Sequence, residues 1–282
     1  MRHIDAPEGT LARSPASNAG CSGIIHFPDL AAVFPMIEFS VTGWSAWAPG
    51  LPQAQDWIDW AHAATPAAPL GEGAPALADV PPVMRRRIDR LGRMAISATD
   101  DCDVSPVRED VPLVFVSRHG DVAGSVELLR ALGQAEPLSP TAFSLSVHNA
   151  VAALYSIVRK RHGNYLALAG GAASVENACI EAAALLADGA PEVLLVCYDG
   201  PLPEVYDDFA DEPAHAYAWC WRLAAADAGG ERLSLSWEAD GLAPAPASAL
   251  QHGLAVHHFL LSGQPQLDVA VEDQRWRWRR HG

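Results

Sequence analysis

The sequence predicts an α/β domain with a mixed, largely parallel sheet flanked by helices. Short apolar runs such as residues 193–197 have the length of buried strands. They alternate with segments in which apolar residues recur at helical spacing, and this alternation is typical of βαβ units. Half of the 282 residues are hydrophobic, so the chain can bury a substantial core.

The first part of the chain is expected to contain little regular structure. Residues 1–35 show neither a strand period nor a helix period, and we expect them to form a poorly ordered extension. A strand is expected to begin at Met36, and the pattern of residues 53–64 predicts a helix. A linker rich in proline, alanine and glycine follows at residues 65–82.

An amphipathic basic helix is expected next. Met84, Ile88, Leu91 and Ala95 recur at helical spacing and predict a buried stripe. The remaining surface of the helix carries arginines, namely Arg85, Arg86, Arg90 and Arg93. This basic face could be solvated, with its arginines in weak surface ion pairs, or it could bind an acidic protein.

The central region predicts alternating strands and helices. The expected elements are a strand at 111–117, a helix at 120–132, a helix at 144–160, a strand at 165–169, a helix at 173–187 and a strand at 192–198. Two further strands, 216–223 and 232–237, flank an Ala/Gly turn and are expected to pair as a hairpin at the sheet edge. We expect the domain to end near residue 240.

Residues 241–282 are expected to form a C-terminal extension. Its last strand alternates apolar residues from Leu267 and ends in an Arg/Trp run at residues 275–280. Such a run could bind a membrane surface or RNA, but a final strand that frays into solvent is the favoured interpretation.

Composition excludes several classes of protein. A formal charge of −15 repels polyanions and argues against nucleic acid as the main ligand. The apolar runs are shorter than the roughly 20 residues that cross a bilayer, and no secretory signal is recognisable, so a cytoplasmic location is expected. The five cysteines are widely spaced and predict reduced thiols.

The segment Tyr165–Asn177 is the most informative for function. It predicts a strand that enters a tight turn and opens a helix, an arrangement that can present a nucleophile at a helix N-terminus. Here the tip is glycine and alanine. Gly170 and Gly171 do not complete a Gly-x-Gly-x-x-Gly fingerprint, so the sequence gives little support to a phosphate-binding or dinucleotide cofactor site.

Several motifs resemble the N-terminal half of β-ketoacyl synthases. They are residues 139–149 (SPTAFSLSVHN), the elbow, residues 192–196 (EVLLV), the basic segment 84–94 and residues 115–121 (FVSRHGD). In this order they are most similar to the chain-length-factor family of bacterial aryl polyene clusters, over roughly residues 36–237. The resemblance implies a thiolase-like N-terminal half with a mixed five-stranded sheet flanked by helices.

Two departures from the ketosynthase pattern bear on activity. If Val175-Glu176-Asn177 aligns with the Val-His-Asn that follows the family's nucleophilic cysteine, that cysteine's position falls on Gly171, which cannot form a thioester. The family's second half also supplies two histidines, one in a His-Gly-Thr-Gly-Thr stretch, and this stretch does not occur through Gly282. The resemblance therefore implies no catalytic residue and no cofactor.

The resemblance implies a heterodimer with a complete β-ketoacyl synthase. The family pairs the strand before the nucleophile with its twin, so Tyr165, Ala167 and Ala169 are expected at the partner interface. The residues expected to shape the partner's acyl tunnel are Phe143, Val147, Val151 and Leu154. Arg85, Arg86 and Arg90 are the residues expected to dock an acyl carrier protein.

Two other functions remain open. The chain could be a stand-alone acyltransferase or hydrolase that uses Ser146, Ser174 or Cys179, although Ser146 and His148 would point to different faces of a helix. It could also be a scaffold that assembles pathway enzymes without touching the acyl chain.

The histidines near the C-terminus give no support to a metal site. His252, His257 and His258 have no cysteine or carboxylate partner at ligand spacing. No metal is therefore expected.

Overall fold

The computed structural model describes residues 35–103, 108–239, 249–271 and 273–282. The described residues all belong to one unit of the chain, Phe34–Gly282. The expected N-terminal extension, apart from Pro35, lies outside the described residues. Within the described part, no helix is both long and apolar enough to span a bilayer.

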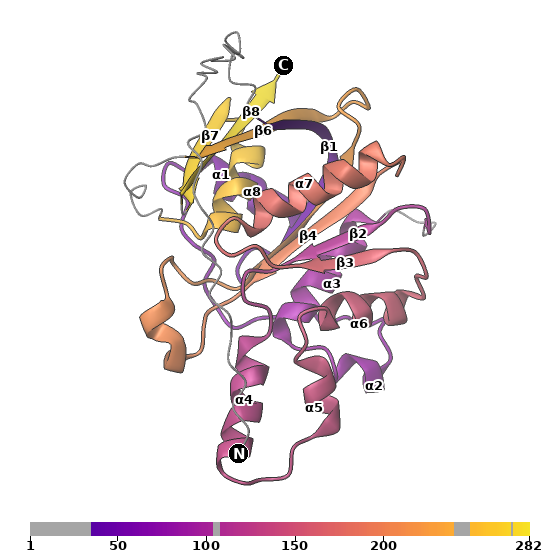
Figure 1. Ribbon diagram of the computed structural model, residues 1–282, viewed down its shortest axis with the longest axis vertical. Helices are drawn as coiled ribbons and strands as arrows, with labels where there is room; N and C mark the ends of the chain where they lie inside the picture. Colours follow the sequence, from indigo (N-terminus) through magenta and orange to yellow (C-terminus); the bar gives the residue numbers. More distant parts are fainter. Residues whose placement is uncertain (1–34, 104–107, 240–248, 272) are drawn as a thin grey trace, which may run out of the picture. The chain divides into compact units, whose positions relative to one another are not determined.

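One mixed sheet of eight strands forms the centre of this unit (Figure 1). Its strands lie in the order β3 (Tyr165–Leu168), β2 (Leu113–Val116), β4 (Val193–Asp199), β5 (Tyr217–Ala224), β1 (Met36–Trp47), β6 (Glu231–Ala239), β8 (Gln274–His281) and β7 (Gln266–Val271). Strand β2 runs parallel to β3 and β4, and the other neighbours are antiparallel. The sheet therefore has more strands than the five expected.

Strand β1 joins two parts of this sheet by pairing with both β5 and β6. It has 12 residues, long enough for Ser40–Trp47 to pair with β5 while Met36–Val41 pair with β6. The expected hairpin of β5 and β6 is therefore wrong, because β1 lies between these two strands. The turn that joins them is local, whereas the strand inserted between them comes from about 180 residues earlier in the sequence.

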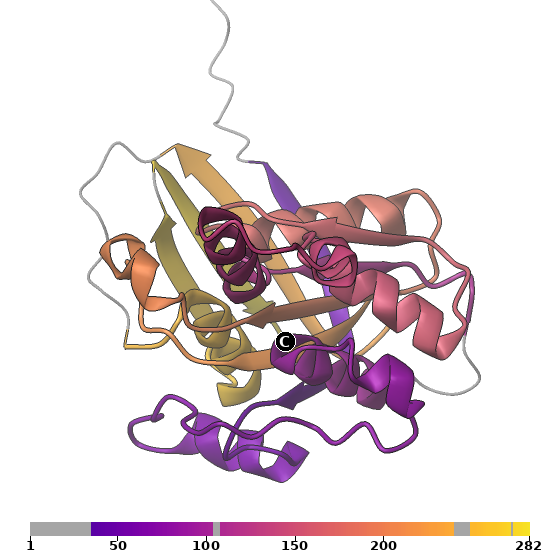
Figure 2. The same cartoon turned by 90° about the horizontal axis from the view of Figure 1, so that it is seen from below.

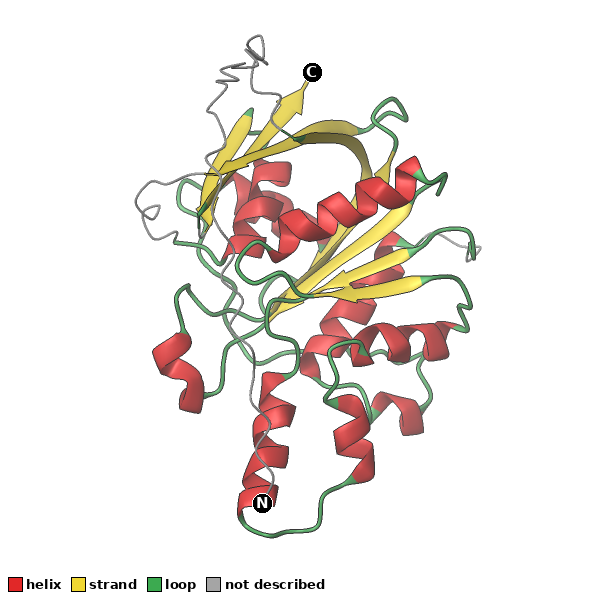
Figure 3. Ribbon diagram, viewed as in Figure 1, coloured by secondary structure: helices red, strands yellow, loops and turns green. Residues whose placement is uncertain are grey.

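Helices cover both faces of the sheet (Figures 2 and 3). They are α1 (Ala54–His62), α2 (Pro82–Arg85), α3 (Arg90–Cys102), α4 (Val122–Gly133), α5 (Pro140–Leu145), α6 (Ala150–Arg159), α7 (Ser174–Ala187) and α8 (His252–Ser262), with a 3₁₀ helix η1 (Glu204–Phe209). Side chains of α1, α7 and α8 pack in one core cluster, and those of α3 and α6 in the cluster on the other face.

Two helices expected as continuous are divided. The basic segment breaks between α2 and α3 because Asp89 acts as an N-cap, its carboxylate accepting the Gly92 N–H at 2.8 Å. Residues 144–160 divide into the end of α5 and α6. Ser146 ends α5 with its hydroxyl on the Phe143 carbonyl, 2.9 Å away, and α6 begins at Ala150.

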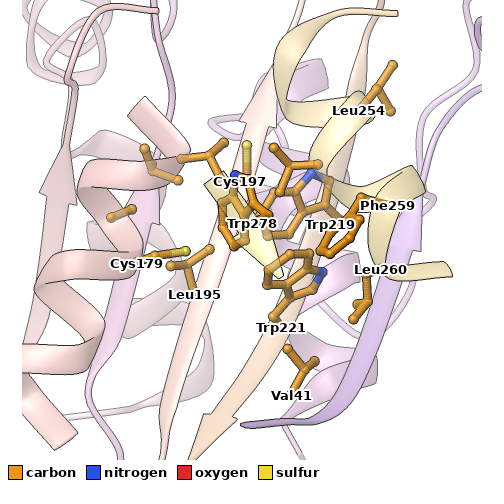
Figure 4. Close-up of a cluster of buried hydrophobic side chains, with 14 of the residues drawn as sticks. Val41, Cys179, Leu195, Cys197, Trp219, Trp221, Leu254, Phe259, Leu260 and Trp278 are labelled. Carbon is orange, nitrogen blue, oxygen red and sulfur yellow. The ribbon is translucent and has the colours of Figure 1, made fainter. Parts of the chain in front are cut away.

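The core between α7, α8 and the sheet is rich in tryptophan (Figure 4). Trp219 and Trp221 of β5 stack with ring centroids 4.7 Å apart, and Trp278 of β8 meets Trp221 edge to face. Trp276 and Trp278 are 2% and 0% exposed, so the Arg/Trp run does not fray. It forms strand β8, which pairs with β6 and β7 and buries alternate side chains.

Candidate functional site

The turn between β3 and α7 is a tight glycine elbow. Gly171 lies at φ +62, in the left-handed region that favours glycine. The Ser174 hydroxyl accepts the Gly170 N–H at 3.0 Å and donates to the Gly171 carbonyl at 2.7 Å. A Cβ atom on Gly170 would stand 2.7 Å from Nδ2 of Asn177. The elbow thus holds its shape through backbone and Ser174, and its exposed tip carries no side chain.

The side chains considered as alternative nucleophiles are buried or hydrogen-bonded within the chain. Ser174 is buried and engaged in the elbow, and burial raises the pKa of the Cys179 thiol well above its usual value. Nε2 of His148 contacts the Leu168 carbonyl at 2.9 Å, while the Ser146 hydroxyl donates to Phe143. Ser146 and His148 are therefore not paired with each other.

A buried polar network begins at the start of α7. Glu176 is 0% exposed, and its carboxylate accepts hydrogen bonds from Nε2 of His252 at 2.9 Å and Nε1 of Trp278 at 3.1 Å. The Glu212 carboxylate accepts the His252 backbone N–H and pairs with Arg118 at 3.2 Å. Burial disfavours protonation of His252, but the Glu176 carboxylate outweighs it and raises the His252 pKa.

The network was not expected from the sequence, which gave His252 no role. The available signal was a glutamate in the first turn of a helix rich in apolar residues, because a glutamate needs a partner if that turn is buried. The partners lie more than 70 residues away on α8 and β8, so no spacing rule could identify them.

The carboxyl ends of β2 and β4 are joined by a second buried acid. The Ser117 hydroxyl donates to Asp199 at 2.7 Å, and the Arg118 N–H donates to the same carboxylate at 3.1 Å. Burial raises the pKa of Asp199 to about 6. A small hollow of about 20 Å³ is lined by His119, Glu212 and Gln251 among others.

Two grooves flank α5, the short helix after the projecting helix α4 (Figure 1). The larger, about 560 Å³, is bounded by α4, α5, α6 and the segment before α3, and we call it the α4–α5 groove. The other is about 490 Å³ and lies between α2, α5 and α6. Val147, Val151 and Leu154 line the α4–α5 groove, whereas Phe143 lines neither and is 64% exposed.

Strand β3 forms one end of the sheet and pairs, within the described part, with β2 alone. Its Leu166 is exposed, and so is Ile157 of α6, the helix that contacts β3. Phe143 and Val147 are exposed as well. Tyr165 and Ala167 are half-buried, and Ala169 directly follows the strand. An unpaired edge with exposed apolar residues is typical of a strand that pairs with another chain.

Two of the three arginines expected to dock a carrier protein are used within the chain. Arg85 donates to the Leu77 carbonyl, and Arg90 donates to the carbonyls of Gly71 and Gly73 in the linker before α2. Arg86 is exposed and lines the α4–α5 groove, as does its neighbour Arg87.

The histidines near the C-terminus are held by other groups. His257 stacks on Trp219 and accepts the Trp221 Nε1–H at 3.0 Å, and burial lowers its pKa to about 3. His258 contacts the Ala61 carbonyl at 3.1 Å. The described ranges contain no group of three or more His, Cys, Asp or Glu residues placed to hold a metal.

Comparison with known proteins decides the family. The family model of the β-ketoacyl synthase N-terminal domain matches residues 57–279, which is most of the chain. The chain belongs to this family. A search of curated proteins gives no match.

Solved structures agree with this β-ketoacyl synthase assignment. A chain in the complex of the ketosynthase ApeO with its chain length factor ApeC from Xenorhabdus doucetiae is 26% identical, with a TM-score of 0.74. The alignment covers 86% of this chain and 100% of that one. The domain therefore has the thiolase-like ketosynthase fold that the sequence predicts.

Two more distant structures share the β-ketoacyl synthase fold. The ishigamide ketosynthase/chain length factor is 17% identical with a TM-score of 0.57, covering 73% of this chain and 68% of the other. A β-ketoacyl synthase from Burkholderia phymatum STM815 is 16% identical with a TM-score of 0.56, covering 80% and 69%. At these identities the similarity concerns the fold.

Proposed function

We propose that this chain is a non-catalytic chain-length factor. It pairs with a complete β-ketoacyl-[acyl carrier protein] synthase in fatty-acid or polyketide-type biosynthesis, of the aryl polyene kind, and helps to shape that enzyme's acyl tunnel. The observation that carries the proposal is the elbow, which has the strand–turn–helix form of a nucleophile site but presents Gly171 at its tip. A glycine can form no acyl thioester.

The length of the similar chain supports the proposal. The chain matched in the ApeO–ApeC complex is covered over its whole length by the present chain of 282 residues. The match thus concerns a chain of comparable size in a structure that pairs a ketosynthase with a chain length factor. We infer a partner of the same class for the present chain.

The free edge of the sheet supplies a surface for that partner. Main-chain groups of β3 that face away from β2 can extend a ladder into a second sheet. The side chains of Leu166, Phe143 and Val147 are exposed, and we expect their apolar surface to be removed from water when the partner binds. Tyr165, Ala167 and Ala169 then belong to the interface strand and its continuation.

Co-expression with the ketosynthase encoded beside this chain tests the partner role. With a tag on one protein only, we expect a one-to-one complex that elongates acyl chains, while neither protein does so alone. A chain that purifies by itself beside a fully active ketosynthase would contradict the proposal and favour the stand-alone enzyme.

A charge on the edge strand gives the sharper form of this test. Leu166→Asp is expected to weaken the complex by roughly a hundredfold, because the carboxylate would be desolvated in the interface. Val205→Asp is the matched control, since Val205 is 61% exposed on η1, away from β3. Both variants should keep the wild-type melting temperature, and equal binding by both would exclude β3 as the interface.

Tunnel residues are tested through product length. Phe143→Ala or Val147→Ala, in the assembled complex, is expected to lengthen the main product by about one extension unit, because a smaller side chain leaves more room at the end of the tunnel. Ile157→Ala, another exposed apolar residue, should leave product length unchanged. Mass spectrometry of the released products measures the effect, and identical profiles would favour a scaffold that does not touch the acyl chain.

The stand-alone acyltransferase or hydrolase remains the alternative. Its residues would be Ser146, Ser174 or Cys179, and the last two are buried. An acyl-enzyme adduct on the isolated chain would support it.

Carrier-protein docking is proposed for Arg86, the one exposed arginine among the three considered.

A further inference from the structure

The 3₁₀ helix η1 presents both apolar and acidic side chains to solvent. Val205 is 61% exposed and Phe209 is 70% exposed. The same six-residue helix carries Glu204, Asp207 and Asp208, whose side chains are exposed and have no hydrogen-bond or ion-pair partner among the described residues. Exposed apolar residues beside unpaired charge are typical of a surface that another protein covers.

The segment after η1 is fastened to the rest of the domain. Arg118 pairs with Asp211 at 2.7 Å and with Glu212 at 3.2 Å. Within η1, the rings of Tyr206 and Phe209 meet edge to face with their centroids 6.0 Å apart. Because these contacts restrain η1 before a partner binds, little conformational entropy is lost on binding.

A complementary surface lies at the short helix α2 of the same chain. Among the described residues, the lysine and arginine side chains without a hydrogen-bond or ion-pair partner are Arg86, Arg87 and Lys160. Arg86 and Arg87 are exposed neighbours, and Val83, one turn earlier, is 59% exposed. In Figure 1, α2 and the orange helix η1 lie on opposite sides of α4 and α5, so these two surfaces can meet only between chains.

We propose that copies of this chain associate head to tail, with η1 of one copy bound to α2 of the next. Phe209 and Val205 lose contact with water against Val83, and the η1 carboxylates pair with Arg86 and Arg87. The two surfaces are small, so the association is weak, and it weakens further when salt screens the charges.

The contact is heterologous, because it joins two different surfaces. Each added copy leaves one η1 and one α2 free, so the assembly can grow beyond a dimer. This self-association concerns the isolated chain and does not depend on the ketosynthase. Arg86 is also the residue proposed to dock a carrier protein, so an acidic carrier competes with η1 for α2.

Charge reversal tests the pairing of η1 with α2. In sedimentation velocity, the mean sedimentation coefficient of the wild-type chain is expected to rise with protein concentration. Asp207→Arg/Asp208→Arg and Arg86→Glu/Arg87→Glu should each raise the dissociation constant roughly tenfold or more, because surfaces of like charge then meet. An equimolar mixture of the two variants should associate again, since the basic η1 of one variant meets the acidic α2 of the other.

Control variants separate this contact from general effects of charge and hydrophobicity. Asp188→Arg/Asp227→Arg makes the same change of net charge at exposed positions after α7 and β5, and it should associate at least as well as the wild type. Phe209→Ser should weaken the association about tenfold. Leu132→Ser, on α4 and 61% exposed, should not weaken it.

Three results would contradict head-to-tail association. A wild-type chain that stays monomeric up to its solubility limit would overturn the proposal and leave η1 to a basic surface of another protein. Charge variants that associate as the wild type does, or a mixture of them that stays monomeric, would overturn it as well. A thermal melt checks that each variant folds, and if a charge variant does not, the comparison of Phe209→Ser with Leu132→Ser decides.

Discussion

Replacing Glu176 with alanine is expected to lower the free energy of unfolding by about 3–5 kcal/mol. The carboxylate is completely buried and accepts hydrogen bonds from His252 and Trp278. Its removal leaves both donors without an acceptor and opens a cavity at the start of α7. Urea denaturation followed by tryptophan fluorescence measures the loss.

Two further variants and the pH dependence test whether the loss of unfolding free energy comes from this network. Glu176→Gln keeps one acceptor and should cost less, and Glu181→Ala on the same helix should have little effect. The His252 pKa is raised in the folded chain, so the stability that His252 contributes is complete below its ordinary value of 6.5 and declines as pH rises through the folded pKa. In Glu176→Ala this decline should vanish, and a variant that retained it would show that His252 is protonated through another group.

Acid is expected to destabilise the chain through His257. Burial keeps the folded-state pKa of His257 at about 3, against an ordinary value of 6.5. The contribution of the neutral His257 ring to the free energy of unfolding is therefore complete above about pH 6.5. Below that pH it is lost at roughly 1.4 kcal/mol per pH unit. His257→Gln keeps an acceptor for Trp221 but cannot titrate. When the pH falls from 6.5 to 5, the free energy of unfolding of the variant should therefore rise by about 2 kcal/mol relative to that of the wild type.

The difference between variant and wild type is the quantity to measure, because other groups titrate over the same range. Burial raises the pKa of Asp199 to about 6, so Asp199 favours the folded state increasingly as pH falls from about 6 towards 3.8 and opposes the effect of His257. His258→Gln, on the same helix but half-buried, is the control and should show a smaller shift. Equal shifts for the two variants would contradict the assignment to His257.

The buried network and the tryptophan core show how the C-terminal segment is joined to the rest of the domain. Strand β8 supplies Trp278 to the core and a donor to Glu176, and α8 supplies His252 and His257 to the same region. The segment expected as a C-terminal extension therefore packs against the helix that starts at the elbow. This packing helps to hold the elbow in place.

The sequence by itself determined the alternation of strands and helices, the elbow and the family. These features depend on local periodicity, on glycine at the turn and on motifs that are contiguous in the chain, such as residues 139–149. The resemblance placed glycine at the position of the nucleophile, and in the structure Gly171 lies at the tip of the elbow.

Only the tertiary structure decided the rest. The insertion of β1 between β5 and β6 and the burial of β8 depend on pairing between distant segments, which period and propensity do not encode. The partners of Glu176 could not be predicted for the same reason. Nor could the hydrogen bonds that Arg85 and Arg90 donate to carbonyls of the linker. A side chain's partner depends on which elements the sheet order brings together, and that order is set by burial of the whole core rather than by any local stretch of sequence.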